Sequence, residues 1–345
     1  MKKLLIAGYF LLASLLPMSL QADELVLAEN APEVYIVKKG DTLWAISNMY
    51  LRDPWLWPEI WEVNPQVDNP HLIYPGDQLY LVWVDGQPRL RVRRGEASRT
   101  VKLTPTMRVE PLSLAIPAVS LEQIGAWLTG HRIVEPVDLE NAPYVVAGEK
   151  RHLLSAAGDL FYARGEFPEG ETGFGIFRRG DVYSDPLTGE VLGVQAVDIG
   201  SAVMEETHDE DINQLEVTRV TEEVRNADRL LPNETRSITA TFYPRAPETD
   251  TDAFMIAVDG GVSQIGTMDV VAINLGEREG MEAGTVLAIF QTGEEVKDPV
   301  TREKIRMPDM RAGLLMVFRT FEKVSYGIVM RSDRPLAVGD RVTNP

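Results

Sequence analysis

Two segments of this chain are similar in sequence, and this repeat constrains the fold more than any other feature. Residues 175–180 read Gly-Ile-Phe-Arg-Arg-Gly and residues 288–293 read Ala-Ile-Phe-Gln-Thr-Gly. The register continues from the Asp-Pro-Leu-Thr-Gly-Glu of residues 185–190 to the Asp-Pro-Val-Thr-Arg-Glu of residues 298–303, and then through later matches (217–219 with 329–331, 227–230 with 339–342). A shared register over this length predicts two successive copies of one domain.

The repeated segments are rich in β-branched and aromatic residues and are separated by turn residues. In the second copy they predict four strands and a tight reversal at Glu322 and Lys323 (strands 270–274, 285–290, 314–320 and 324–331). Asp185 and Asp298 each begin Asp-Pro-x-Thr, which predicts a turn whose carboxylate accepts backbone amides rather than a catalytic acid. Each copy should therefore be a small, mainly antiparallel barrel or sandwich.

A different pattern precedes the repeat, between residues 34 and 82. A short strand at residues 34–38 ends before Gly40, and Thr42 can cap a helix. A second helix fits residues 55–63, a turn fits residues 75–77, and a closing strand follows at residues 78–82. We expect a β-α-α-β unit, which makes the whole chain α+β.

This unit, from Gly40-Asp41-Thr42-Leu43-Trp44 to Ile73-Tyr74-Pro75-Gly76-Asp77, resembles a LysM domain. The resemblance implies binding to glycans that contain N-acetylglucosamine, in a shallow groove between two loops. A neutral sugar needs backbone polar groups and an apolar floor. Carried onto this chain, the implied groove consists of eight residues: Gly40, Asp41, Thr42, Leu43, Asn69, Pro70, Ile73 and Tyr74.

The predicted second helix carries more tryptophan than this family usually has. Trp55, Trp57 and Trp61 follow Trp44 closely. Some of these rings must fill the small core, whereas one or two could form an exposed patch for a partner protein or for sugar stacking.

The first residues have the form of a secretory signal peptide. Lys2 and Lys3 precede an apolar run at residues 4–16, and Ala22 offers a cleavage point. The run is too short for a stable membrane span, although retention as an anchor is the alternative. Since the chain has no cysteine, it has neither disulfides nor a lipid attachment site, and we expect a periplasmic protein. The expected domains are a signal peptide (1–22), a LysM domain (33–83), a basic linker (84–117), a helix plus first β-repeat (118–247) and a second β-repeat (248–345).

Charge is unevenly distributed along the chain. The formal net charge is −18, which argues against nucleic acid as a partner. Arginines gather in the expected linker and favour a solvated segment; contact with anionic peptides of the cell wall or with an acidic face of the same chain is the alternative. Acidic residues gather at 205–223 and predict a solvated loop, without the spacing of a calcium site.

Many LysM proteins carry an enzyme of the cell wall on the same chain, and each such enzyme needs characteristic residues. The chain has no cysteine nucleophile, no HExxH or H-x-H pair, and no Ser-x-x-Lys pattern. His71 lies in the expected sugar loop and is most simply a surface histidine. We expect neither catalysis nor a cofactor, and a wall-remodelling glycosidase that uses one glutamate is the alternative.

Residues 52–77 and residues 261–342 together resemble the type IV pilus secretin-associated protein (TsaP) family. The last part is also similar to the C-terminal domain of the flagellar assembly protein FlgT, with Gly276, Gly280 and Gly284 at its turns. The resemblance implies a periplasmic protein that holds an outer-membrane secretin ring to peptidoglycan. An anchor for a flagellar ring or another envelope ring remains an alternative.

Overall fold

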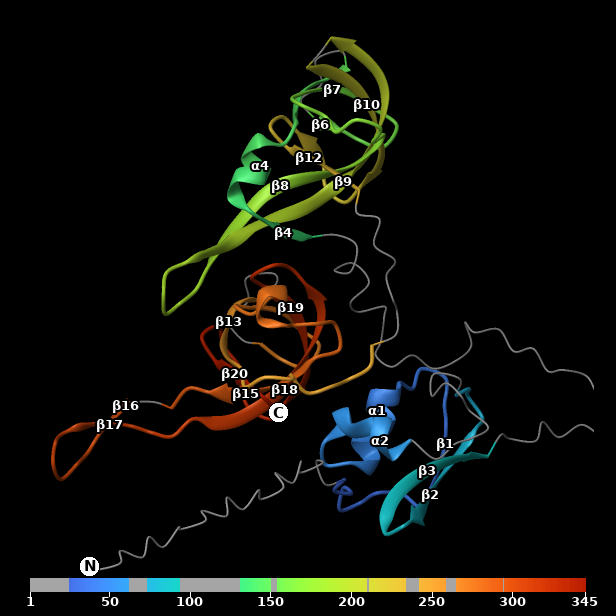
Figure 1. Ribbon diagram of the computed structural model, residues 1–345, viewed down its shortest axis with the longest axis vertical. Helices are drawn as coiled ribbons and strands as arrows, with labels where there is room; N and C mark the ends of the chain where they lie inside the picture. The colour runs from blue at the N-terminus through green and yellow to red at the C-terminus, as the bar shows by residue number, and fades with distance from the viewer. Residues whose placement is uncertain are drawn as a thin grey trace, which may run out of the picture.

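The computed structural model describes residues 25–61, 73–93, 131–149, 154–209, 211–233, 242–258, 265–293 and 295–345. Figure 1 shows a small module with helices and two β-rich units, of which the C-terminal one lies in the middle. The α+β prediction is thereby confirmed. The expected signal peptide (1–22) and the expected helix at residues 120–128 lie outside the described residues.

The described part of the N-terminal module, residues 25–61 and 73–93, contains three strands and three short helices. Its elements are β1 (Val34–Ile36), α1 (Leu43–Tyr50), η1 (Pro54–Leu56), α2 (Trp57–Ile60), β2 (Gln78–Val84) and β3 (Gln87–Arg93). The sheet order is β1-β2-β3, and all pairings are antiparallel. The β-α-α-β expectation holds, and a third strand extends the sheet beyond it.

Strand β3 corrects part of the expected linker at residues 84–117. Asp85 and Gly86 have φ values of +52° and +81°, so both adopt the left-handed conformation of a two-residue hairpin turn. That turn brings β3 back along β2, where Leu90 and Val92 enter the core. Arg89, Arg91 and Arg93 therefore lie on an ordered strand.

Within its described residues, the first β-unit contains one helix and nine strands. Its elements are β4 (Arg132–Val134), α4 (Pro136–Asn141), β5 (Tyr144–Gly148), β6 (Leu154–Ser155), β7 (Leu160–Arg164), β8 (Gly173–Ser184), β9 (Val191–Asp209), β10 (Ile212–Val220), β11 (Val224–Arg225) and β12 (Arg229–Pro232). Six of them pair in the order β5-β7-β10-β9-β8-β12, and a pairing of β12 with β5 completes the ring. We call this unit barrel 1.

The second β-unit is a closed barrel with the pairing order β13-β14-β19-β18-β15-β20. Its elements are β13 (Asp252–Val258), β14 (Val270–Ile273), η5 (Glu277–Glu279), β15 (Val286–Gln291), β16 (Glu295–Lys297), β17 (Lys304–Arg306), β18 (Met310–Thr320), β19 (Ser325–Ser332) and β20 (Arg341–Thr343). We call it barrel 2. Taken in chain order, its six strands pair as those of barrel 1 do, so the predicted duplication of a β-domain is confirmed.

Turn geometry is repeated together with topology. The Oδ1 atom of Asp185 accepts the amides of Leu187 and Thr188 at 2.9 and 2.7 Å. Asp298 accepts the equivalent amides of Val300 and Thr301 at 2.7 and 3.2 Å. The sequence Asp-Pro-x-Thr thus builds the same hairpin end twice, in the structural role that the sequence predicts.

The acidic segment at residues 205–223 is not the solvated loop that its composition predicts. Most of it belongs to strands β9 and β10, which pair with each other. Gln214, Glu216 and Thr218 alternate along β10 with Leu215 and Val217, which are buried inside barrel 1. Alternation of this kind is the signature of a half-buried strand, and it outweighs the local charge.

Apolar side chains cover both surfaces of the wall of barrel 2. Alternate residues such as Val271 and Ile273 fill its interior, whereas Val270 and Ala272 belong to an outer cluster that is continuous with the N-terminal module. Strand β18 is accordingly buried from Ala312 to Phe318. Burial on both faces explains why this strand reads as an unbroken apolar run.

The N-terminal module packs against barrel 2. Trp57 of α2 stacks on Tyr243, the residue that precedes barrel 2, with ring centroids 6.2 Å apart. Arg331 of β19 also donates to the carbonyl of Arg52 at 3.3 Å. A Cβ atom added to Gly284 would lie 2.4 Å from the carbonyl oxygen of Tyr243, so only glycine fits beneath this segment.

Barrel 1 reaches barrel 2 through the long β8–β9 hairpin, which projects in Figure 1. Near its end, Tyr183 and Leu192 are buried in the outer cluster of barrel 2. The side-chain amide of Asn274 donates to Asp185 at 2.6 Å, and Arg278 donates to both oxygens of Glu190 at 2.8 and 3.2 Å. The amide of Thr188, and then Asn274, lower the pKa of Asp185 to about 2. We call residues 182–193 the first arm.

Candidate functional site

Two loops of the N-terminal module lie side by side at one end of its sheet. The amide of Val37 donates to the carbonyl of Asp77 at 2.9 Å, and the amide of Gly76 donates back to Val37 at 2.8 Å. These bonds join the loop after β1 to the loop before β2. The structure therefore brings together the two segments that the sequence predicts to form a sugar groove, as far as they are described.

Both loops are shaped by the same turn, a left-handed glycine followed by aspartate. Asp41 accepts the amide of Lys38 at 2.7 Å, and Asp77 accepts the amide of Tyr74 at 3.0 Å. The glycines before them have φ values of +94° and +98°, which residues with a Cβ rarely adopt. These carboxylates hold backbone, and that role fixes the shape of the two loops.

The first loop is tied to both the strand before it and the helix after it. The Tyr35 hydroxyl donates to Asp41 at 2.9 Å, and burial, then Asp41, raises the pKa of Tyr35. The Thr42 hydroxyl accepts the amide of Ala45 at 3.1 Å, which confirms the predicted helix cap. Beneath the loop, burial and then Tyr35 raise the pKa of Tyr50 to about 12.

The eight proposed groove residues differ in their exposure. Gly40 is exposed, whereas Asp41, Thr42 and Tyr74 are half-buried and present part of their surface. Leu43 is buried, and Ile73 is 0% exposed. The expectation that Ile73 forms the apolar floor of the groove is therefore wrong, because this side chain fills the core. Tyr74 is the apolar group that a ligand can reach. Asn69, Pro70 and His71 lie outside the described residues.

The tryptophans do not form the exposed patch that their number predicts. Trp55, Trp57 and Trp61 are buried, as is Trp44. The apolar cluster that contains them also includes residues of α1 and of barrel 2, so these rings belong to a core shared between the two units. Their partner surface is within the chain, which corrects the expectation of a contact with a separate protein at these rings.

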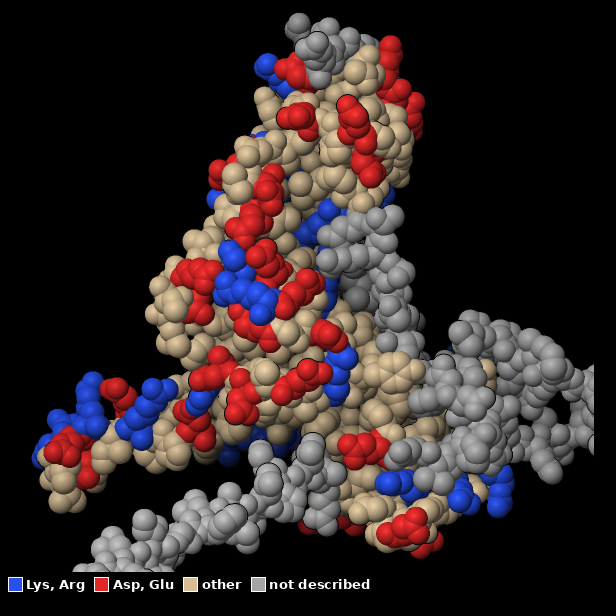
Figure 2. Space-filling view, viewed as in Figure 1, with Lys and Arg blue, Asp and Glu red and all other residues tan. Residues whose placement is uncertain are grey.

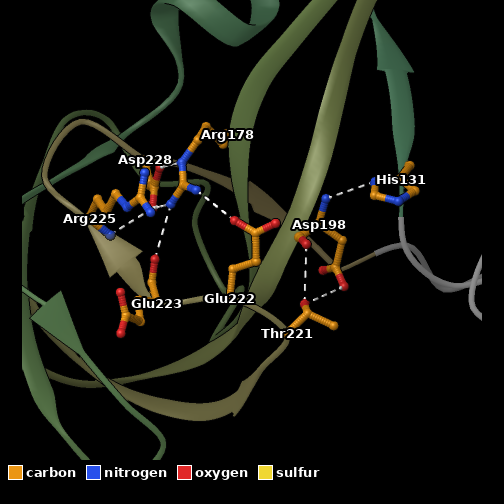
Figure 3. A network of polar contacts seen from close by, with 8 residues as sticks. All are labelled: His131, Arg178, Asp198, Thr221, Glu222, Glu223, Arg225 and Asp228. Atoms are coloured by element: carbon orange, nitrogen blue, oxygen red, sulfur yellow. Dashed lines mark hydrogen bonds and ion pairs between the residues drawn. The ribbon is translucent and has the colours of Figure 1, made fainter. Parts of the chain in front are cut away.

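Figure 3 shows a network of polar side chains in barrel 1. Arg178 donates to both oxygens of the buried Asp228 at 2.9 Å and to Glu222 at 2.8 Å. Asp228, then Glu222, raise the pKa of Arg178. Each carboxylate in these bonds is matched with a guanidinium, so the network acts as a brace between β8 and the turn before β12.

The same view shows a smaller set of contacts around Asp198, whose backbone amide donates to Nδ1 of His131 at 3.1 Å. Its carboxylate accepts hydrogen bonds from both terminal nitrogens of Arg219 at 2.8 and 2.9 Å. This pair also serves structure rather than proton transfer. Within the described part of the chain, no three histidine or acidic side chains gather in a way that could hold a metal ion.

Strand β3 is the part of this module that the sequence interpretation missed. Two signals pointed to it: Asp-Gly at residues 85–86, and the alternation of arginine with Leu90 and Val92. The charge of the segment concealed both signals.

Comparison with known proteins agrees with this geometry. Residues 35–82 match the family model described as LysM domain. The uncharacterized protein YqbP of Bacillus subtilis (strain 168) is 37% identical in the matched region, which covers 15% of this chain. The chain spans about 28% of the length of that relative.

The matched residues cover β1, both helices of the module and most of β2, and therefore include the two joined loops. Across the described ranges, no helix is both long and apolar enough to pass through a membrane. LysM is a binding module without catalytic groups, and it indicates binding to peptidoglycan and association with the cell wall. Residues 35–82 of this chain are a LysM domain.

Proposed function

We propose that this protein is a non-catalytic periplasmic scaffold. Its LysM domain binds glycan strands of peptidoglycan, and its barrels anchor an outer-membrane secretin ring of the type IV pilus system. The observation that carries the first half is the pair of joined loops at residues 37–42 and 73–77 in a domain that matches LysM. Resemblance to the secretin-associated family supports the second half.

The joined loops suit a neutral sugar. Gly40 has open space around its Cα, which lets a ligand approach the backbone closely. Tyr74 offers a half-buried ring at the other side of the groove. Backbone polar groups for an acetamide and one aromatic face for a sugar ring are the features that orient such ligands.

Replacing Tyr74 with alanine should weaken binding to glycan strands about tenfold, or about 1.4 kcal/mol. The ring is lost, while the Tyr74 amide that donates to Asp77 is retained, so the loop keeps its shape. Co-sedimentation of the full chain with purified peptidoglycan measures the change. The control is Tyr162→Ala, which removes a half-buried ring from barrel 1.

Unchanged sedimentation of a folded Y74A variant would place glycan binding elsewhere. The same mixtures also separate the scaffold from the alternative glycosidase. A scaffold pellets with peptidoglycan and releases no soluble fragments, whereas release of muropeptides by the wild-type protein would replace the scaffold with an enzyme.

The best-supported surface for docking on a ring is the β16–β17 hairpin, residues 295–306, which we call the second arm. It projects from barrel 2 in Figure 1, as the first arm projects from barrel 1. The repeat aligns Tyr183 and Leu192 of the first arm with Val296 and Ile305 of the second. Tyr183 and Leu192 are buried, whereas Val296 and Ile305 are 45% and 46% exposed.

The first arm supplies the precedent for what the second arm contacts. It docks through an apolar pair and through Asp185 and Glu190, which meet an amide and a guanidinium of barrel 2. Asp298 and Glu303 occupy the equivalent positions of the second arm. The second arm therefore suits an apolar face with polar partners for Asp298 and Glu303, and we assign that face to the secretin ring.

A photo-reactive residue at position 300 should cross-link the secretin subunit in living cells. Val300 is 87% exposed at the end of the second arm and lies within reach of any surface on which that arm docks. The matched control is position 187, which occupies the same turn of the first arm and is also exposed.

Cross-linking of secretin at both positions, or at neither, would remove the second arm from the proposal. Cross-linking of a flagellar ring component at position 300 would instead select the alternative assembly.

A further inference from the structure

The outer face of the LysM sheet carries a row of arginines. Leu90 and Val92 of β3 point into the core, so Arg89, Arg91 and Arg93 point to the opposite face. Directly paired residues of antiparallel strands share a face. The rows across the sheet are accordingly Ile36–Gln78–Arg93, Val34–Tyr80–Arg91 and Val82–Arg89.

This outer face contains no carboxylate of its own. The eight residues of these three rows are three arginines, Gln78, Tyr80, Val82 and the exposed Val34 and Ile36. Arg93 lies over the Tyr80 ring, 5.5 Å from its centroid. Among the residues that the structure describes, no carboxylate pairs with Arg91 or Arg93. In a chain with a net charge of −18, such a row is a local exception. Figure 2 shows blue side chains over this module in one view.

The arginine row begins next to the proposed sugar groove. The Ile36–Gln78–Arg93 row is the last one of the sheet before the hydrogen bonds that join Val37 to Gly76 and Asp77. Neighbouring strands are about 4.8 Å apart, so Arg93 on β3 lies roughly 10 Å from the loop after β1. Arg91 and Arg89 continue away from the groove in steps of about 6.7 Å along the strand.

We propose that this arginine face binds carboxylates of the peptide branches of the same peptidoglycan strand that the groove holds. The inference rests on the proposed glycan function and extends it. Glycan strands carry peptides with free carboxylates, and a planar guanidinium binds a carboxylate through two parallel hydrogen bonds. The groove then binds the sugar backbone, and the arginine face binds the anionic peptides beside it.

The test compares two forms of purified peptidoglycan with the full chain. One form has intact peptide branches, and in the other an amidase has removed the peptides from the glycan strands. Both are first freed of covalently bound phosphate polymers. The test variant is R91Q/R93Q, and the matched control is K304Q/R306Q, which removes two cations from alternate positions of the exposed strand β17.

Wild-type protein should bind intact peptidoglycan about tenfold more tightly than the stripped strands, and high salt should remove this preference. R91Q/R93Q should lose the preference and keep its affinity for stripped strands, whereas K304Q/R306Q should keep both. Unaltered thermal unfolding of the variants establishes that they fold.

Three results would overturn the inference. Equal affinity of R91Q/R93Q and wild-type protein for intact peptidoglycan would mean that the arginines only keep the edge of the sheet soluble. An equal loss on both forms would place these arginines in the groove itself. A preference that appears only when phosphate polymers are left in place would identify phosphate as the anion. Failure of wild-type protein to bind stripped strands would instead contradict the proposed glycan function.

Discussion

Replacing Trp57 with alanine should separate the LysM domain from barrel 2 and cost about 3–5 kcal/mol of stability. The side chain is 2% exposed and fills the space between the helices of the module and Tyr243. Alanine leaves a cavity too large for the neighbouring backbone to close. Hydrogen exchange of the full chain measures the effect, and faster exchange in α1 and β2 is expected.

A second variant shows how much of this loss of stability comes from the core of the module and how much comes from its docking on barrel 2. Tyr243 belongs to the segment before barrel 2, so Tyr243→Ala removes the stacking partner and leaves the LysM core intact. We expect Y243A to loosen the docking while α1 keeps its protection. The double variant should show a coupling of about 1 kcal/mol, as aromatic pairs do. Additive losses would mean that the two rings do not act together.

This pair of residues also shows where sequence reasoning ends. The tryptophans were visible as an excess for a small module, but nothing local shows which side of a helix another domain will cover. Trp57 stacks on Tyr243, which is far away in the sequence. A tryptophan that the core of the module does not need can pack against another domain instead. Composition alone therefore could not distinguish an exposed patch for a partner protein from a contact within the chain.

The duplicated barrel, by contrast, could be predicted because its signals are local and occur twice. Asp185 and Asp298 fix the same turn with the same atoms, and the matching register carries through the strands on both sides. Predictions failed where charge hid alternation, as on β3 and on β9 and β10. Alternate positions of β10, such as Leu215 and Val217, were already apolar. In each case the period of the apolar residues was the better guide.

The arrangement gives barrel 2 a central role. One side of its outer wall receives the LysM domain, and the first arm of barrel 1 docks on the same apolar cluster. Barrel 2 therefore lies between the proposed sugar groove and the second arm. In the function that we propose, force between the wall polymer and the ring would pass through this barrel.

The repeat also supplies an internal control for the contribution of the Arg178 contacts to the stability of barrel 1. Asp228 and Asp340 occupy the same turn, and each accepts the amide three residues before it, at 2.7 and 2.9 Å. Asp228 is 3% exposed and binds Arg178 through two further bonds. Asp340 is also buried, and desolvation raises its pKa.

Substitution with asparagine should therefore have different effects at the two positions. Asp228→Asn keeps the turn but removes the charge that Arg178 faces, and we expect a loss of about 2 kcal/mol in barrel 1. Asp340→Asn should cost barrel 2 little at pH 7. A raised pKa means that the stabilising contribution of protonated Asp340 is present below the usual aspartate pKa, about 4, and is lost at higher pH.

Urea unfolding of the full chain, followed by hydrogen exchange of peptides from each barrel, measures both effects. At pH 4 the wild-type protein should gain stability relative to D340N, because Asp340 becomes protonated, whereas D228N should remain the less stable variant at pH 7. Equal losses for the two variants at pH 7 would mean that the shared turn carries the stability and that the guanidinium adds none. A loss confined to barrel 1 in D228N would instead assign the difference to the pairing with Arg178, which Asp340 lacks.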